Sequence, residues 1–209
     1  SQGCNPLLVK FTSQSTGISA NAIFEWDFGN GNRSGTKNPS AIYTEEKTFS
    51  VTLTVRDNGQ VSTASREIIV HPAPQFHFVS AVDKLCIPAA AQFSCEPKPG
   101  SSGFTHFFWE FGDGSTAEST SSQVSHAYNM ELQPSISLTV TNNYGCYSSV
   151  RKNGLLNVLP RLQPDFKAND SVLCRVDEPV QFSNNSTGPG TLSYEWQFGD
   201  GTTSTLREP

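Results

Sequence analysis

The stretch FFWEFGDG, residues 107–114, decides the fold of this chain, and it occurs in two further versions: FEWDFGNG at 24–31 and YEWQFGDG at 194–201. In each copy three aromatic residues alternate along the chain, which places them on one face of a β-strand with mostly polar residues on the other. These residues are Phe24, Trp26 and Phe28, then Phe107, Trp109 and Phe111, then Tyr194, Trp196 and Phe198. Each copy therefore predicts a half-buried strand whose aromatic face builds a core.

Each copy ends in a Gly-Asp-Gly or Gly-Asn-Gly turn. Glycine adopts positive φ without a steric penalty, and Asp or Asn before glycine favours a tight turn. The turn glycines are Gly29, Gly31, Gly112, Gly114, Gly199 and Gly201. We expect each aromatic strand to stop directly after its last aromatic residue.

The spacing of the copies predicts a tandem array. Trp26 and Trp109 are 83 residues apart, and Trp109 and Trp196 are 87 apart, which is long enough for one small β-sandwich per copy. We divide the chain into 1–72, a module lacking its first strand, 73–160, a complete module, and 161–209, a module truncated after its central strand. We therefore expect the chain to be a segment of a longer protein, or its missing strands to come from elsewhere.

Alternating hydrophobic residues predict the remaining strands. In the first module we expect strands at 7–11, 24–28, 49–55 and 68–70, and in the second at 75–80, 89–94, 106–111, 125–128, 135–141 and 155–158. The junctions at 71–76 and 159–166 are short and contain two prolines each. Short proline-rich linkers are semi-rigid, so we expect a stiff rod of modules.

The hexapeptides WDFGNG, WEFGDG and WQFGDG resemble the signature of the PKD (polycystic kidney disease) domain family. Tyr43 and Tyr128 and the strands that follow them agree with the family pattern, so the resemblance covers essentially the whole chain. It implies all-β, immunoglobulin-like β-sandwiches of extracellular proteins, which serve as spacers or binding accessories and not as catalysts. The placement of the cysteines is similar to that in repeats of large surface proteins of gliding or type IX-secreting Bacteroidota.

Composition excludes several function classes. The net charge of −5 and the pI near 5.3 disfavour a nucleic-acid partner, which would need a basic stripe. No apolar run approaches the length of a membrane span, so we expect no membrane contact by this segment. No nucleophile elbow, phosphate loop or informative carboxylate pair is present, so we predict no catalytic site and no enzyme activity.

Five cysteines in a β-rich chain of this kind indicate disulfides formed in an oxidising compartment. Cys4, Cys86 and Cys174 each precede the second strand of their module, whereas Cys95 and Cys146 are expected at the opposite pole of the second module. The poles lie roughly 17–20 Å apart, which disfavours a Cys86–Cys146 bond. Two hypotheses remain open: Cys95 pairs with Cys146, or Cys4 pairs with Cys95 or Cys146 across the junction between modules.

Two further candidate sites deserve a test. Asp27, Asp113 and Asp200 lie at the glycine turns and are weak candidates for calcium, which some relatives in the family bind, although turn formation explains them as well. Otherwise the sequence predicts no cofactor. Phe108 faces away from the core, so it either contacts a neighbouring element or module, or stacks on a ligand.

These observations favour a non-catalytic extracellular stalk or spacer in a large, adhesin-like surface or secreted protein. Its expected partners are other modules of the same chain, and a protein or polysaccharide ligand is an open alternative. A substrate-binding accessory of a secreted hydrolase is the second hypothesis. The third is an extracellular filament whose incomplete modules are completed by strand donation.

Overall fold

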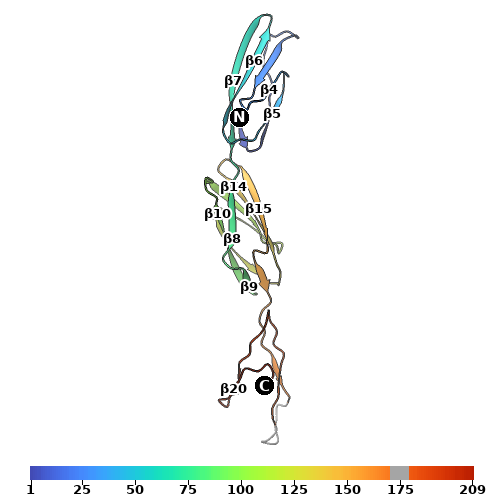
Figure 1. The fold of residues 1–209 in the computed structure, drawn as a ribbon, viewed down its shortest axis with the longest axis vertical. Coiled ribbons are helices and arrows are strands. Elements are labelled where there is room, and N and C mark those ends of the chain that lie inside the picture. Colours follow the sequence, from blue (N-terminus) through green and yellow to red (C-terminus); the bar gives the residue numbers. More distant parts are fainter. Residues whose placement is uncertain (170–178) are drawn as a thin grey trace.

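The computed structural model describes residues 1–169 and 179–209, and its regular elements there are β-strands. Three parts follow one another end to end along the long axis (Figure 1). The N-terminus lies at the end of the first part that faces the second, and the C-terminus lies in the third part. In the described ranges no helix is long and apolar enough to span a membrane.

The first module contains two packed sheets. Its strands are β1 (Gln2–Cys4), β2 (Leu7–Lys10), β3 (Ile23–Asp27), β4 (Arg33–Ser34), β5 (Ser40–Tyr43), β6 (Thr48–Asp57) and β7 (Gln60–His71). One sheet has the order β1-β7-β6-β3-β4, and β2 pairs with β5 in the other. Trp26 on β3 is in register with Leu53 on β6, and both are buried. The alternating aromatic strand thus forms the centre of the core, as its pattern requires.

The second module repeats this plan with more strands. They are β8 (Phe76–Ser80), β9 (Lys84–Cys86), β10 (Ala89–Pro97), β11 (Phe104–Glu110), β12 (Thr116–Ser119), β13 (Gln123–Tyr128), β14 (Ser135–Asn142), β15 (Tyr147–Asn153) and β16 (Asn157–Leu159). The two sheets have the orders β13-β10-β8 and β12-β11-β14-β15. Trp109 is fully buried between them, with its ring 5.5 Å from that of Phe78 and 5.9 Å from that of Phe93. The all-β, immunoglobulin-like sandwich expected from the sequence is confirmed.

The two modules share a parallel strand pair at the end that leads to the next module. In the first, β1 runs parallel to the end of β7, and in the second, β9 runs parallel to β16. The β2–β5 pair of the first module corresponds to the β10–β13 pair of the second. In the second module β8 lies on the other side of β10, and no described strand lies in that position beside β2.

The third part has four short strands: β17 (Phe166–Ala168), β18 (Phe182–Asn184), β19 (Trp196–Gln197) and β20 (Thr203–Ser204). They form two separate pairs, β17 with β18 and β19 with β20. The ring of Trp196 lies 5.4 Å from Phe166 and 5.7 Å from Phe182. This aromatic cluster is not fully covered, because Phe166 is 58% exposed and Trp196 is only half-buried.

Several strand expectations need correction. The final hairpin of the second module is formed by β14 and β15, whereas the sequence pattern placed the last strand only at 155–158. The pattern failed because β15 is an edge strand of alternating exposed and half-buried residues, with little hydrophobic signal. The short strands β1 and β9 were also missed, and β7 is 12 residues long rather than confined to 68–70.

Candidate functional site: the joint between the first two modules

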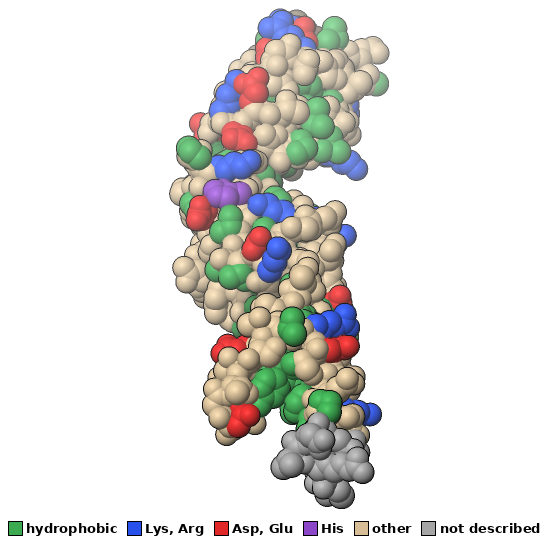
Figure 2. All heavy atoms as spheres, turned by 60° about the horizontal axis from the view of Figure 1, so that its bottom comes forward, with side chains coloured by type: hydrophobic (Ala, Val, Ile, Leu, Met, Phe, Trp, Pro, Cys, Tyr) green, Lys and Arg blue, Asp and Glu red, His purple; other side chains and the backbone are tan. Residues whose placement is uncertain are grey.

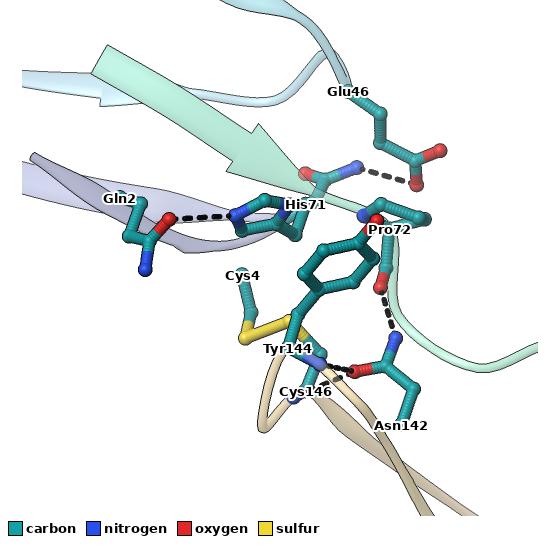
Figure 3. The surroundings of a disulfide bond; sticks show 9 residues. Gln2, Cys4, Glu46, His71, Pro72, Asn142, Tyr144 and Cys146 are labelled. Carbon is teal, nitrogen blue, oxygen red and sulfur yellow. Dashed lines mark hydrogen bonds between the residues drawn. A yellow bond between two sulfur atoms is a disulfide. The ribbon is translucent and has the colours of Figure 1, made fainter. Parts of the chain in front are cut away.

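A disulfide bond joins the first module to the second (Figure 3). Cys4 is the last residue of β1, and Cys146 lies in the turn between β14 and β15. Their Cα atoms are 5.5 Å apart, although the residues are separated by 142 positions in the sequence. The bond therefore closes a covalent loop that contains nearly all of both modules.

The parallel pairing of β1 with β7 places Cys4 at the joint. Cys4 is in register with His71, the last residue of β7, and the next amide, that of Asn5, donates a hydrogen bond to the His71 carbonyl at 3.0 Å. The chain leaves the first module at His71 and enters the linker. Cys4 consequently lies beside the point where the chain crosses to the second module.

Asn142 shapes the opposite side of the joint. Its side-chain oxygen accepts hydrogen bonds from the backbone amides of Tyr144 and Cys146, both at 3.0 Å, which fixes the turn that carries the cysteine. Its side-chain nitrogen donates to the carbonyl oxygen of Pro72 in the linker at 2.9 Å. Because Asn142 is only 4% exposed, these hydrogen bonds satisfy polar atoms that water does not reach freely.

An aromatic contact completes the joint. The rings of His71 and Tyr144 stack with their centroids 4.0 Å apart and an interplanar angle of 8°. On its other side the His71 ring is hydrogen-bonded to the side chain of Gln2 at 3.2 Å. In Figure 3, Gln2, His71 and Tyr144 lie next to one another, in that order from left to right, above the disulfide. A covalent bond, a ring stack and a hydrogen bond therefore connect the two modules.

Of the disulfide alternatives, the structure supports the one that links modules. The Cys95–Cys146 hypothesis is wrong, because Cys95 lies inside the sandwich of the second module, 5% exposed and opposite Phe78 on β8. Burial, together with the nearby charge of Glu96, raises the pKa of the Cys95 thiol to about 11. The disfavoured Cys86–Cys146 pair does not form either, and Cys86 is exposed. Cys174 lies outside the described residues.

The three glycine turns have the same hydrogen-bonding pattern. The side-chain oxygens of Asn30, Asp113 and Asp200 each accept the backbone amide two residues later, at 3.1, 2.9 and 2.8 Å. The last aromatic residue of each strand donates its amide across the turn, to the carbonyls of Asn32, Ser115 and Thr202 respectively. All six turn glycines, Gly29, Gly31, Gly112, Gly114, Gly199 and Gly201, have positive φ.

The first glycine of the turn also permits a close approach in the two modules with packed sheets. A Cβ atom added at Gly29 would lie 2.6 Å from the carbonyl oxygen of Ser50, and one at Gly112 would lie 2.8 Å from backbone atoms of Ser135. At Gly199 no such neighbour is present among the described atoms. The turn therefore brings the end of the aromatic strand into backbone contact with the neighbouring strand of the same sheet, β6 in the first module and β14 in the second.

Tyr43 and Tyr128 hold the end of the aromatic strand from the other sheet. Their hydroxyls donate to the carbonyls of Phe28 and Phe111, at 3.2 and 3.0 Å, and both side chains are fully buried. Burial raises the pKa of both phenols. These tyrosines serve packing and hydrogen bonding, consistent with their place in the sequence pattern.

The aspartates considered for calcium are each engaged within their own turn. Asp27 accepts the Gly29 amide and pairs with Arg33, and Asp200 accepts the amide and hydroxyl of Thr202; these bonds lower the pKa of both carboxyls. The pKa of the Asp113 carboxyl is lowered as well. Burial by itself would raise this pKa, but the hydrogen bonds from His126 and Ser115 together have a larger effect. Over residues 1–169 and 179–209 no three His, Cys, Asp or Glu side chains gather as a metal site would require.

Phe108 lies on β11 between Phe107 and Trp109, which are both buried. Its own side chain is half-buried on the opposite face of the sheet, in register with Thr139 on β14 and Glu118 on β12. The surface shown in Figure 2 carries scattered side chains of both charges. A groove of about 480 Å³ lies in the third part, with Leu162, Phe166 and Trp196 among its lining residues.

The residues of the joint other than the cysteines could not be identified from the sequence. His71, Asn142 and Tyr144 belong to segments that the hydrophobic pattern indicates only as a junction and a turn. The available signal was indirect: a cysteine before the second strand of one module and another in the last turn of the next. Only the folded arrangement of the strands brings these segments together.

Comparisons with known proteins find distant similarities. The chain is 25% identical to human polycystin-1 over 207 residues, which cover 92% of this chain and about 4% of the length of polycystin-1. Among solved structures, fibronectin(III)-like modules of Clostridium thermocellum CbhA give a TM-score of 0.44 at 9% identity, covering 75% of this chain and 87% of theirs. A variant of titin domains I67–I69 gives 0.45 at 13% identity, covering 98% of this chain and 78% of the other.

The PKD domain family matches residues 2–72 and 71–155, one copy for each of the first two modules. PKD domains are immunoglobulin-like, non-catalytic modules typical of extracellular modular proteins, and a disulfide bond fits such a location. Since the match covers more than half of the sequence, the chain belongs to the PKD domain family.

Proposed function

We propose that this chain is a non-catalytic spacer, a segment of an extracellular stalk that holds other domains of a large surface or secreted protein at a distance. The observation that carries the proposal is the joint: a disulfide, a ring stack and a buried hydrogen bond fix two modules that follow each other along the long axis. A spacer needs a defined length and direction, and a cross-linked joint supplies both.

The composition of the joint supports a mechanical role over a recognition role. Its polar groups are directed at one another: Asn142 is occupied by the Pro72 carbonyl and by its own turn, and His71 by Gln2 and Tyr144. Few polar atoms are thus left to meet a ligand. Trp26 and Trp109 are buried and build the core of each module, so they are not available to a ligand either.

The parent protein that we propose is a large adhesin-like surface protein of the kind that gliding or type IX-secreting Bacteroidota carry. This part of the proposal rests on the placement of the cysteines before the second strand and in the last hairpin. Other modules of the same long chain would be its principal partners.

The test is a binding and assembly assay on the oxidised chain. Purified protein is incubated with insoluble polysaccharides, including chitin and cellulose, and with fibrous proteins, and its self-association is followed by light scattering. A spacer remains in the supernatant and monomeric, and Phe108→Ala behaves like the wild type. His106→Ala, a change at a half-buried position on the same strand, serves as the matched control.

Each alternative function has its own outcome in this assay. Sedimentation with a polysaccharide that is lost in Phe108→Ala but kept in His106→Ala would replace the spacer by a binding accessory of a secreted hydrolase. Concentration-dependent growth of particles without a ligand would instead favour a filament completed by strand donation. Either result contradicts the spacer function.

A further inference from the structure

We propose that the Cys4–Cys146 disulfide is a covalent bypass, which carries tension along the chain past nearly all of the first module and most of the second. This inference rests on the proposed spacer function, because a stalk experiences tension between its ends. The relevant observation is the connectivity of the covalent loop, which is closed across the joint rather than within either module.

The path of the force follows from that connectivity. Tension applied between the N-terminal residues and the C-terminal part enters at Cys4, crosses the two sulfur atoms and continues from Cys146. Residues 5–145 lie inside the loop and are not on this path. The first module from Asn5 onward and strands β8 to β14 of the second are therefore not stretched by it.

Within the first two modules, β1 and the last strands of the second module lie on the loaded path. β15 begins directly after Cys146, and β16 ends the module. β15 pairs with β14 along its whole length, and β16 pairs with β9. Tension should peel these two strands from partners that lie inside the loop, and the polar face of β15 makes its removal less costly than that of a central strand.

The bypass limits how far the joint can extend. Cys4 and Cys146 are separated by 142 positions in the sequence, and at about 3.3–3.6 Å per extended residue this separation corresponds to roughly 470–510 Å of chain. With the bond intact, that length is replaced by a Cα–Cα distance of 5.5 Å. A dithiol would reduce this bond: it supplies two electrons and two protons, converts the two sulfur atoms to thiols and itself becomes a disulfide. The extended length of the loop would then be added to the part of the chain under tension.

The experiment is single-molecule stretching of the full 209-residue chain, held by peptide tags at its two termini so that no cysteine is used for attachment. We compare the oxidised wild type, the variant C4S/C146S and the control C86S/C95S, which alters two cysteines outside the joint. The readout is the total contour length after complete extension. This readout does not require the variant to be folded.

The oxidised wild type and C86S/C95S should stop short of the C4S/C146S length by roughly 470–510 Å. Adding a reducing agent to a held wild-type molecule should release the same total length. Full extension of the oxidised wild type without that deficit would overturn the proposal. A shorter contour length of the oxidised wild type together with polysaccharide binding in the assay above would support the bypass and contradict the spacer function. The failure of one proposal can therefore be told from the failure of the other.

Discussion

The two junctions of this chain have similar sequences and different structures. Both are short and carry two prolines, at 71–76 and 159–166. At the first, Cys4–Cys146, the His71–Tyr144 stack and the Asn142–Pro72 hydrogen bond cross between modules. At the second, no disulfide, ion pair, ring stack or hydrogen bond crosses between 73–160 and the described residues of 161–209. Proline content alone therefore does not determine how a joint is held, since residues distant in the sequence do so.

The largest expected effect is on the reactivity of the cysteines: Cys4 and Cys146, joined across the first junction, should not react before reduction, whereas Cys86 and Cys95 should react at very different rates. At pH 8 a thiol with a pKa of about 11 is about 0.1% thiolate, and Cys95 is also buried, so we expect it to react with iodoacetamide at least ~100-fold more slowly than exposed Cys86. Peptide mapping of a folded, oxidised Cys174→Ser variant measures both rates. Rapid labelling of Cys4 or Cys146 before reduction would contradict the cross-linked joint.

Removal of the cross-link should cause the largest loss of stability. Closing a loop of 142 residues stabilises the folded pair of modules by about 5 kcal/mol in the chain-entropy model. C4S/C146S should therefore unfold at a lower urea concentration than the oxidised wild type, followed by tryptophan fluorescence. Cys86→Ser is the matched control and should leave the midpoint unchanged. Equal midpoints for C4S/C146S and the wild type would show that the bond does not stabilise the pair.

Asn142→Ala should have the next largest effect. It removes the acceptor for two backbone amides and the donor to Pro72, and it leaves buried polar groups without partners, so a loss of about 1–3 kcal/mol is expected. The neighbouring change Asn143→Ala alters an exposed side chain and should cost much less. Equilibrium unfolding in urea measures both, and an equal loss in the two variants would remove the special role of Asn142.

Tyr144→Ala should have the smallest effect on the joint. It deletes the ring that stacks on His71, a contact worth about 0.5–1.5 kcal/mol for an aromatic pair. Tyr147→Ala is the control, because Tyr147 is 71% exposed. The measurement is the change in stability in the C4S/C146S background, where the stack is no longer supported by the disulfide. A larger loss for Tyr147→Ala than for Tyr144→Ala would contradict our description of the joint.

The fold was predictable from the sequence because each copy of the repeated motif has aromatic residues at every second position, as a half-buried strand does, and ends in a glycine turn. Alternation buries Trp26 and Trp109, and the glycine turn allows the backbone contact that Gly29 and Gly112 make with the next strand. Edge strands were harder to predict. β15 has polar residues on both faces, and β1 is stabilised by its parallel partner and not by an apolar pattern of its own.

The joint was only partly predictable. The cysteine positions and the expected poles of the sandwiches allowed a bond between modules, but they allowed Cys95–Cys146 equally well, because the pattern did not show that Cys95 faces the core. His71 and Tyr144 lie far apart in the sequence, and neither belongs to a periodic pattern that would pair them. Such contacts depend on the angle between two folded modules, which no local signal encodes.

The most direct test of a stiff first joint is a pair of distance distributions. Fluorophores are introduced through unnatural amino acids at exposed positions, one pair across the first junction and one across the second, and energy transfer is recorded on single molecules before and after reduction. We predict a narrow distribution across the first junction that broadens on reduction, and a second distribution that reduction does not change. A first distribution that is as broad when oxidised as when reduced would contradict the account.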